Sequence, residues 1–209
     1  MMPPWARLLI TTLLILLPRL ATAGVVESVA LPGFGGEMTE LRPGMKTGEA
    51  VAVGADGTIR ELGPGVDVGA GDTIVTQRAR VVVDLGDDER VHIAEASRLE
   101  LTAGRTVLQH VGEVYYRVRE AFTVQYGSVE TAVEGTRFLV VGTEVDGGPV
   151  RVSVDEGVVR VTTPEGVQRV SQGQSLGTTP GAPPVVPEPW AAPTRASRSA
   201  RPSRPAPPG

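Results

Sequence analysis

Short runs of alternating apolar and polar residues follow one another along most of this chain, and at two glycines the alternation shifts by one position. In VETAVEGTRFLV the apolar residues fall on odd positions before Gly135 and on even positions after it. In PVRVSVDEGVVRV a similar shift occurs at Gly157. A shift of one residue turns every side chain of a strand to the opposite face, so neither segment forms one regular strand.

Glycine adopts positive φ without steric cost and is common where a strand bulges or bends from one layer to another. Taken alone, Gly135 fits a strand bulge, a corner, or a loop of the catalytic or nucleotide-binding kind. The recurrence of the shift at Gly157 favours a corner of a β framework.

Residues 48–178 consist of such runs, separated by turns rich in Gly and Asp, and no amphipathic helix of about ten residues interrupts them. With 26 glycines and only 4% aromatic residues, the composition suits many short strands joined by tight turns. We therefore predict an all-β domain over 48–178, either an elongated antiparallel β-sandwich or a solenoid-like stack of short strands. Residues 24–47 form a lead-in segment in which we expect at most one strand.

The first 23 residues have the pattern of a secretory signal peptide. Arg7 precedes an apolar run that ends at Pro18, and Ala21-Thr22-Ala23 matches a cleavage site just before Gly24. The apolar run is about ten residues long, whereas a spanning helix needs about twenty, so we predict no transmembrane segment after cleavage. The mature chain is expected in the periplasm, elsewhere in the cell envelope, or outside the cell.

Residues 179–209 are rich in proline and lack apolar periodicity, so we predict a disordered tail. Arginines recur in it at every third position, at Arg195, Arg198, Arg201 and Arg204. Two interpretations remain open: the tail is a solvated spacer, or its arginines contact peptidoglycan, another anionic surface or an acidic partner.

The residues that usually carry out catalysis are scarce. The chain has two histidines and no cysteine, and the spacings of a zinc site, a nucleophile elbow and a phosphate loop are absent. We predict no catalytic residue, no cofactor and no metal. The acids Asp87, Asp88, Asp155 and Glu156 are the remaining candidates for a glycosidase, but they coincide with predicted turns.

The net charge of −4 argues against nucleic acid as a partner, because duplex binding relies on clustered basic residues. Tyr115 and Tyr116 must point to opposite faces of their strand. Since Val114 and Val118 share the parity of Tyr116, we expect that ring in the core and Tyr115 exposed, as a possible contact for a protein or a sugar.

Three motifs follow one another along the chain. Gly112-Glu113 opens the segment GEVYYRV, Gly135, Thr136 and Phe138 form a G-T-x-F pattern, and Glu156-Gly157 begins an E-G-x-V-x-V strand. In this order the motifs resemble those of the FecR-type periplasmic domain family. The resemblance extends over about residues 48–178, and it implies a structural role for these seven residues.

The resemblance also implies an all-β module that passes signals through protein contacts and has no enzymatic activity. In the best-known members a separate cytoplasmic segment controls a sigma factor. Only about seven residues precede the apolar run here, so we expect a stand-alone exported member without that segment. The predicted function is a non-catalytic protein-binding, signalling or scaffolding module that contacts envelope proteins. The alternative is a structural protein associated with the cell wall or its glycans.

Overall fold

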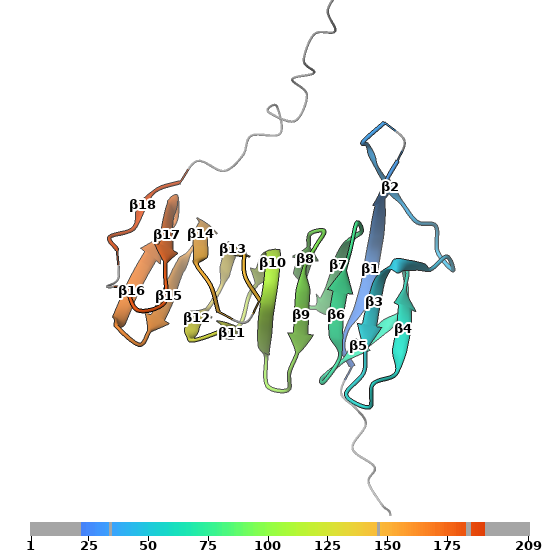
Figure 1. The fold of residues 1–209 in the computed structure, drawn as a ribbon, viewed down its shortest axis with the longest axis horizontal. Coiled ribbons are helices and arrows are strands. Elements are labelled where there is room, and N and C mark those ends of the chain that lie inside the picture. The colour runs from blue at the N-terminus through green and yellow to red at the C-terminus, as the bar shows by residue number, and fades with distance from the viewer. Residues whose placement is uncertain (1–21, 34, 146, 183–184, 191–209) are drawn as a thin grey trace, which may run out of the picture.

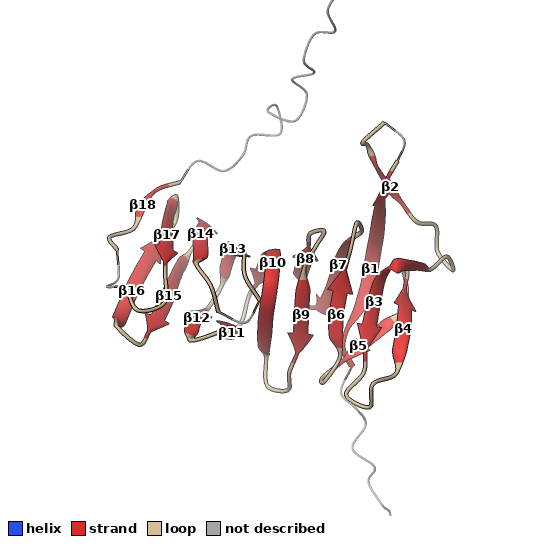
Figure 2. Ribbon diagram, viewed as in Figure 1, coloured by secondary structure: helices blue, strands red, loops and turns tan. Residues whose placement is uncertain are grey.

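The computed structural model describes residues 22–33, 35–145, 147–182 and 185–190, and every regular element among them is a β-strand. Eighteen strands join into one continuous hydrogen-bonded sheet that folds over into two layers. Figure 2 shows only strands and loops. The prediction of an all-β fold is confirmed.

The two layers share one long strand, β10 (Thr106–Val118). The first layer, called layer A, contains β1 (Thr22–Pro32), β2 (Met38–Glu40), β5 (Asp67–Gly69), β7 (Arg80–Gly86), β8 (Glu89–Ile93), β13 (Thr136–Gly142), β14 (Val150–Glu156), β17 (Gln174–Thr178) and β18 (Glu188–Pro189). The second, called layer B, contains β3 (Thr47–Val53), β4 (Ile59–Leu62), β6 (Thr73–Thr76), β9 (Arg98–Leu101), β11 (Phe122–Tyr126), β12 (Val129–Val133), β15 (Val158–Thr163) and β16 (Gly166–Ser171).

From β6 onward the chain alternates between the layers. The hairpins β7–β8 and β13–β14 lie in layer A, and β9–β10, β11–β12 and β15–β16 include strands of layer B. The pairs are antiparallel except β10 with β11, which run parallel. Figure 1 shows the resulting elongated stack, with β1 to β4 at one end and β16 to β18 at the other. An elongated two-layer stack of short strands is what the sequence predicts.

The inner faces of the two layers enclose one continuous core of mostly β-branched side chains. Valine dominates because its branched side chain packs well on a pleated surface. Near the middle, the rings of Tyr116 and Phe138 stack with centroids 4.9 Å apart, and both are fully buried. Tyr116 donates its hydroxyl proton to Gln109 Oε1, so its polar end is satisfied inside the core.

Gly135 and Gly157 lie where the chain passes from one layer to the other. Gly135 joins β12 of layer B to β13 of layer A, and Gly157 joins β14 of layer A to β15 of layer B. Their φ angles are +62° and +90°, in the region that favours glycine. The phase shifts in the sequence therefore mark corners, because the apolar parity must change when a strand enters the opposite layer.

A third corner of this kind lies inside β10, which the sequence pattern divides into two separate runs. Val107 and Gln109 are buried on odd positions, whereas Val114 and Tyr116 are buried on even ones. Between them Gly112 has a φ of +103°, and a Cβ there would clash with the Oγ of Ser97. The strand continues through this bend and so passes from layer B to layer A without a loop.

The lead-in segment is more structured than the single strand that we expected. It contains β1 and β2, and β1 pairs with β7 along Val25 to Ala30 in layer A. β1 begins at Thr22, upstream of the predicted cleavage site. Gly24 packs closely, since a Cβ there would lie 2.5 Å from the carbonyl oxygen of Asp84.

The start of the predicted tail packs against the β stack. Gly181 donates its backbone N–H to Glu165 Oε1, β18 pairs with β17, and the N–H of Trp190 lies 2.7 Å from the carbonyl oxygen of Gly173. The prediction of disorder for 191–209 falls outside the described residues.

Candidate functional site

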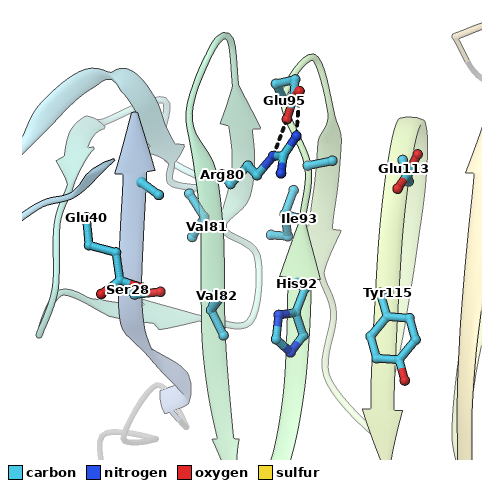
Figure 3. Close-up of a pocket in the computed structure, with 12 residues that line it drawn as sticks. Ser28, Glu40, Arg80, Val81, Val82, His92, Ile93, Glu95, Glu113 and Tyr115 are labelled. Carbon is cyan, nitrogen blue, oxygen red and sulfur yellow. Dashed lines mark hydrogen bonds and ion pairs between the residues drawn. The ribbon is translucent and has the colours of Figure 1, made fainter. Parts of the chain in front are cut away.

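An open groove with a volume of about 490 Å³ lies on the outer face of layer A. It lies across β1, β7, β8 and β10, and Glu40 at the end of β2 closes one side. Figure 3 shows the groove with His92 and Tyr115 on neighbouring strands. An open groove of this kind suits a partner that lies along the sheet better than a small enclosed ligand.

Tyr115 is half-buried, although the sequence pattern predicts an exposed ring. Its hydroxyl donates to Asp155 Oδ2 at 3.0 Å, and its ring meets His92 edge-on with centroids 5.7 Å apart. Burial, followed by the hydrogen bond to Asp155, raises the pKa of Tyr115 to about 12. Loss of hydration lowers the pKa of His92. At neutral pH the middle of the groove is therefore an uncharged aromatic surface.

The charged residues that line the groove are mostly acidic. Arg80 forms two hydrogen bonds with Glu95, at 2.6 and 2.9 Å, and these are drawn in Figure 3. Glu40 and Glu113 are exposed, and neither forms an ion pair with another described residue. Three carboxylates and one guanidinium leave the groove with two excess negative charges at neutral pH.

A row of arginines borders the groove on its other side. Arg90, Arg117 and Arg137 lie opposite one another on β8, β10 and β13. Each of them is ion-paired: Arg90 binds Glu27 and Asp88, Arg117 binds Asp88, and Arg137 binds Glu156. The hydrogen bond from Arg90 and the nearby guanidinium groups lower the pKa of Asp88, which keeps it ionised at neutral pH.

Glu89 is the most deeply buried acid in the described residues, at 2% exposed. Its carboxylate accepts two hydrogen bonds from Arg105, at 2.6 and 2.7 Å, and one each from the backbone N–H groups of Arg119 and Glu120. Burial acts to raise the pKa of Glu89, but these hydrogen bonds outweigh it and lower the pKa. Every oxygen has partners within the fold, so this acid supports the β10–β11 connection.

The seven motif residues occupy different environments. Gly112, Gly135 and Gly157 lie at the three corners, Thr136 donates its hydroxyl to the carbonyl oxygen of Glu134, and Phe138 packs in the core. Two motif acids are exposed instead, since Glu113 lines the groove and Glu156 pairs with Arg137 on the surface. The structure thus brings Glu113 and Tyr115 together, and leaves the glycines away from the groove.

The acids weighed for a glycosidase have partners of other kinds. Asp87 and Asp88 form the β7–β8 turn with positive φ, as expected, but Asp155 lies within β14 rather than in a turn. Asp88 binds arginines and Asp155 accepts the hydroxyl of Tyr115. In the described ranges no three His, Cys, Asp or Glu side chains are close enough to hold a metal ion.

Two groups of predicted site residues remain untested. Ala21 and the tail arginines Arg195, Arg198, Arg201 and Arg204 lie outside the described residues, while Ala23 and Gly24 fall within β1. The described part of the chain contains no helix that could cross a bilayer.

No signal in the sequence identifies Glu40, Arg80 and Glu95 as groove residues. Arg80 and Glu95 meet across the β7–β8 hairpin, and Glu40 joins them only through the pairing of β1 with β2 and β7. Alternation of the strands places each side chain on an outer face, but it does not show which strands are neighbours.

The chain is similar to two crystal structures of a candidate anti-sigma factor from Parabacteroides distasonis ATCC 8503, one at 1.65 Å and one at 2.50 Å resolution. Sequence identity is 22% and 21%, the match covers 52% and 53% of this chain and 55% of each structure's chain, and the TM-score is 0.46 in both cases. This chain therefore spans about half the length of that protein. No curated protein matches the chain.

A family model described as FecR protein matches residues 72–160. This segment runs from the start of β6 into β15 and includes the three corner glycines, Tyr115 and the groove strands β7, β8 and β10. It lies within the predicted domain boundaries of 48–178 and is shorter at both ends. Residues 72–160 of this chain therefore form a FecR-type domain.

Proposed function

We propose that this chain is an exported, non-catalytic module of the cell envelope that regulates signalling by binding another protein. The observation that carries the proposal is the groove on layer A, because it lies mainly within the FecR-type segment. The FecR-type domain supports a role in signalling, and the similar structures bear the description of anti-sigma factors. The partner is expected in the periplasm or elsewhere in the envelope.

The chemistry of the groove supports protein binding. Tyr115 presents an aromatic surface that its hydrogen bond to Asp155 and its contact with His92 hold in place. A rigid aromatic ring is typical of the centre of a protein interface, because it buries a large area at little cost in entropy, and exposed carboxylates are typical of the polar rim around it. Of the acids weighed for a glycosidase, Asp88 and Asp155 are engaged in structural contacts.

Site-specific photo-crosslinking in cells tests this proposal. A photoreactive residue at Val82, which lines the groove, should crosslink to one discrete envelope protein. The matched control is Gln125, which is exposed on the outer face of layer B. Equal crosslinking from both positions, or none from Val82, would count against the groove as the binding surface.

A second candidate function is association with the glycans of the cell wall. The half-buried ring of Tyr115 supports it, since sugars stack on aromatic faces, and so do the arginines of the tail. The full chain should then sediment with purified peptidoglycan. The Tyr115→Ala variant and a chain truncated after Trp190 should not. No sedimentation of the full chain would exclude this function.

A further inference from the structure

The arginines of the C-terminal tail recur with the period of a polyproline II helix. Arg195, Arg198, Arg201 and Arg204 are spaced by three residues within a proline-rich segment. A polyproline II helix has three residues per turn, so in this conformation all four side chains would lie on one face. Successive arginines would be about 9 Å apart, because each residue advances about 3.1 Å.

The groove on layer A offers carboxylates at a matching spacing. Glu113 on β10 and Glu40 on β2 line the same groove. They are the two ends of one row across the sheet, which runs through Ala94, Arg80 and Ala30. Four strand steps separate β10 from β2. At about 4.8 Å per step the two carboxylates are about 19 Å apart. Two turns of polyproline II, from Arg198 to Arg204, span about the same length.

The last described residue places the start of the tail within reach of the groove. Trp190 is held by its hydrogen bond to Gly173, beside β17 and β18. Along layer A, β10 is four steps from β18, or about 19 Å. The eight residues from Trp190 to Arg198 extend about 25 Å in polyproline II, so Arg198 can reach Glu113.

The charges of the two surfaces are complementary. The groove has two carboxylates in excess over guanidinium, and Glu40 and Glu113 form no ion pair with a described residue. The three arginines that border the groove are ion-paired with Glu27, Asp88 and Glu156, which reduces repulsion of a basic segment. Tyr115 adds an aromatic face on which a guanidinium can stack.

We propose that residues 195–204 of the tail dock on the groove of the same molecule, with Arg198 at Glu113, Arg201 near Glu95 and Arg204 at Glu40. Each exposed ion pair contributes little, but tethering gives the tail an effective concentration in about the millimolar range. The tail thus competes with any partner that binds the groove. This inference concerns the same surface as the proposed function but requires no partner.

A spin label on the tail tests the contact directly. The chain has no cysteine, so Ser203→Cys gives a single attachment site for a nitroxide on the full exported chain. We expect the amide NMR signals of β2, β7 and β8 to lose most of their intensity, whereas those of β15 and β16 keep theirs. The variant Glu40→Gln with Glu113→Gln should restore the signals, and so should molar salt, where the Debye length is about 3 Å.

The matched control is Glu130→Gln, which removes an exposed carboxylate from the outer face of layer B and should leave the broadening unchanged. Equal broadening over both layers, or broadening that the two groove substitutions do not reduce, would overturn the proposal.

A mixture of isotope-labelled chain without the nitroxide and unlabelled chain with it should show no broadening. Broadening in that mixture would place the tail on a second molecule and overturn docking within one chain. The test involves no partner, so its failure leaves the proposed function standing.

Discussion

Gly157 packs directly against Gly135: a Cβ on Gly157 would lie 3.0 Å from the carbonyl oxygen of Gly135. The two residues form adjacent corners of the stack, one entering layer A and one leaving it. Both have positive φ, but only Gly157 is crowded, since the nearest atom to a Cβ on Gly135 is 3.7 Å away. The two corners therefore tolerate side chains to different degrees.

Substitutions at these corners should destabilise the whole fold. A non-glycine residue in the left-handed region costs about 1 to 2 kcal/mol, so Gly135→Ala should lower the free energy of unfolding by about that amount. Gly135→Val should lower it by about 1 to 3 kcal/mol. Gly157→Ala should cost more, because a clash with the backbone adds to the strain. Urea unfolding monitored by circular dichroism measures all three.

Gly173→Ala is the control for backbone strain alone, because Gly173 has a φ of +74° and open space around it. It should resemble Gly135→Ala. A Gly135→Val variant with an unchanged melting temperature and lost partner binding would contradict the structural role of this corner and assign it to recognition.

The architecture could be predicted from the sequence wherever burial imposes alternation. The parity changes around Gly135 and Gly157 indicate two layers. A chain that passes from one layer to the other must reverse its apolar alternation so that its apolar side chains still face the same core. The corner at Gly112 was missed because Val111 and Gly112 hide the parity change, and because the close contact with Ser97 involves the loop between β8 and β9.

The groove could not be predicted in the same way. Tyr115 and Glu113 can be assigned to one outer face because they lie on the same strand. Glu40, Arg80 and Glu95 come beside them only because of the order of the strands in layer A. Strand order depends on long-range pairing, for which a single sequence offers no local signal. The half-burial of Tyr115 has the same origin, because Asp155 reaches it from β14.

The hydrogen bond between Tyr115 and Asp155 should be visible in the titration of the phenol. Since the carboxylate favours the protonated hydroxyl, Asp155→Asn should lower the pKa of Tyr115 from about 12 towards its ordinary value. Phenolate absorbance measured against pH reports the change, and Tyr115→Phe identifies the signal. An unchanged titration in Asp155→Asn would show that burial alone sets this pKa.

The first part of the tail should contribute more to stability than the rest. Truncation after Thr178 removes the pairing of β18 with β17 and the hydrogen bonds of Gly181 and Trp190. Hydrogen bonds contribute about 0.5 to 1.5 kcal/mol each, so we expect a loss of about 1 to 3 kcal/mol in the free energy of unfolding. Truncation after Trp190 keeps these contacts, so it should lower that free energy by less, namely by the amount that docking of residues 195–204 contributes. Equal stability of the two truncated chains would contradict the docking of residues 179–190.

The buried carboxylate of Glu89 should make stability depend on pH. Its pKa is lower in the folded chain than in the unfolded one, so its contribution is present above the unfolded value of about 4.3 and is lost as pH falls through the folded value. Glu89→Gln replaces a charged acceptor with a neutral amide facing Arg105, and should lower the free energy of unfolding by about 1 to 3 kcal/mol at neutral pH. The difference from the unmodified chain should shrink as the pH falls below about 4.3 and through the lower folded pKa, where Glu89 itself becomes protonated. Glu130→Gln, which changes an exposed acid, controls for the loss of one negative charge. If the stability difference between Glu89→Gln and the unmodified chain stays constant with pH, the contribution of Glu89 does not depend on its charge.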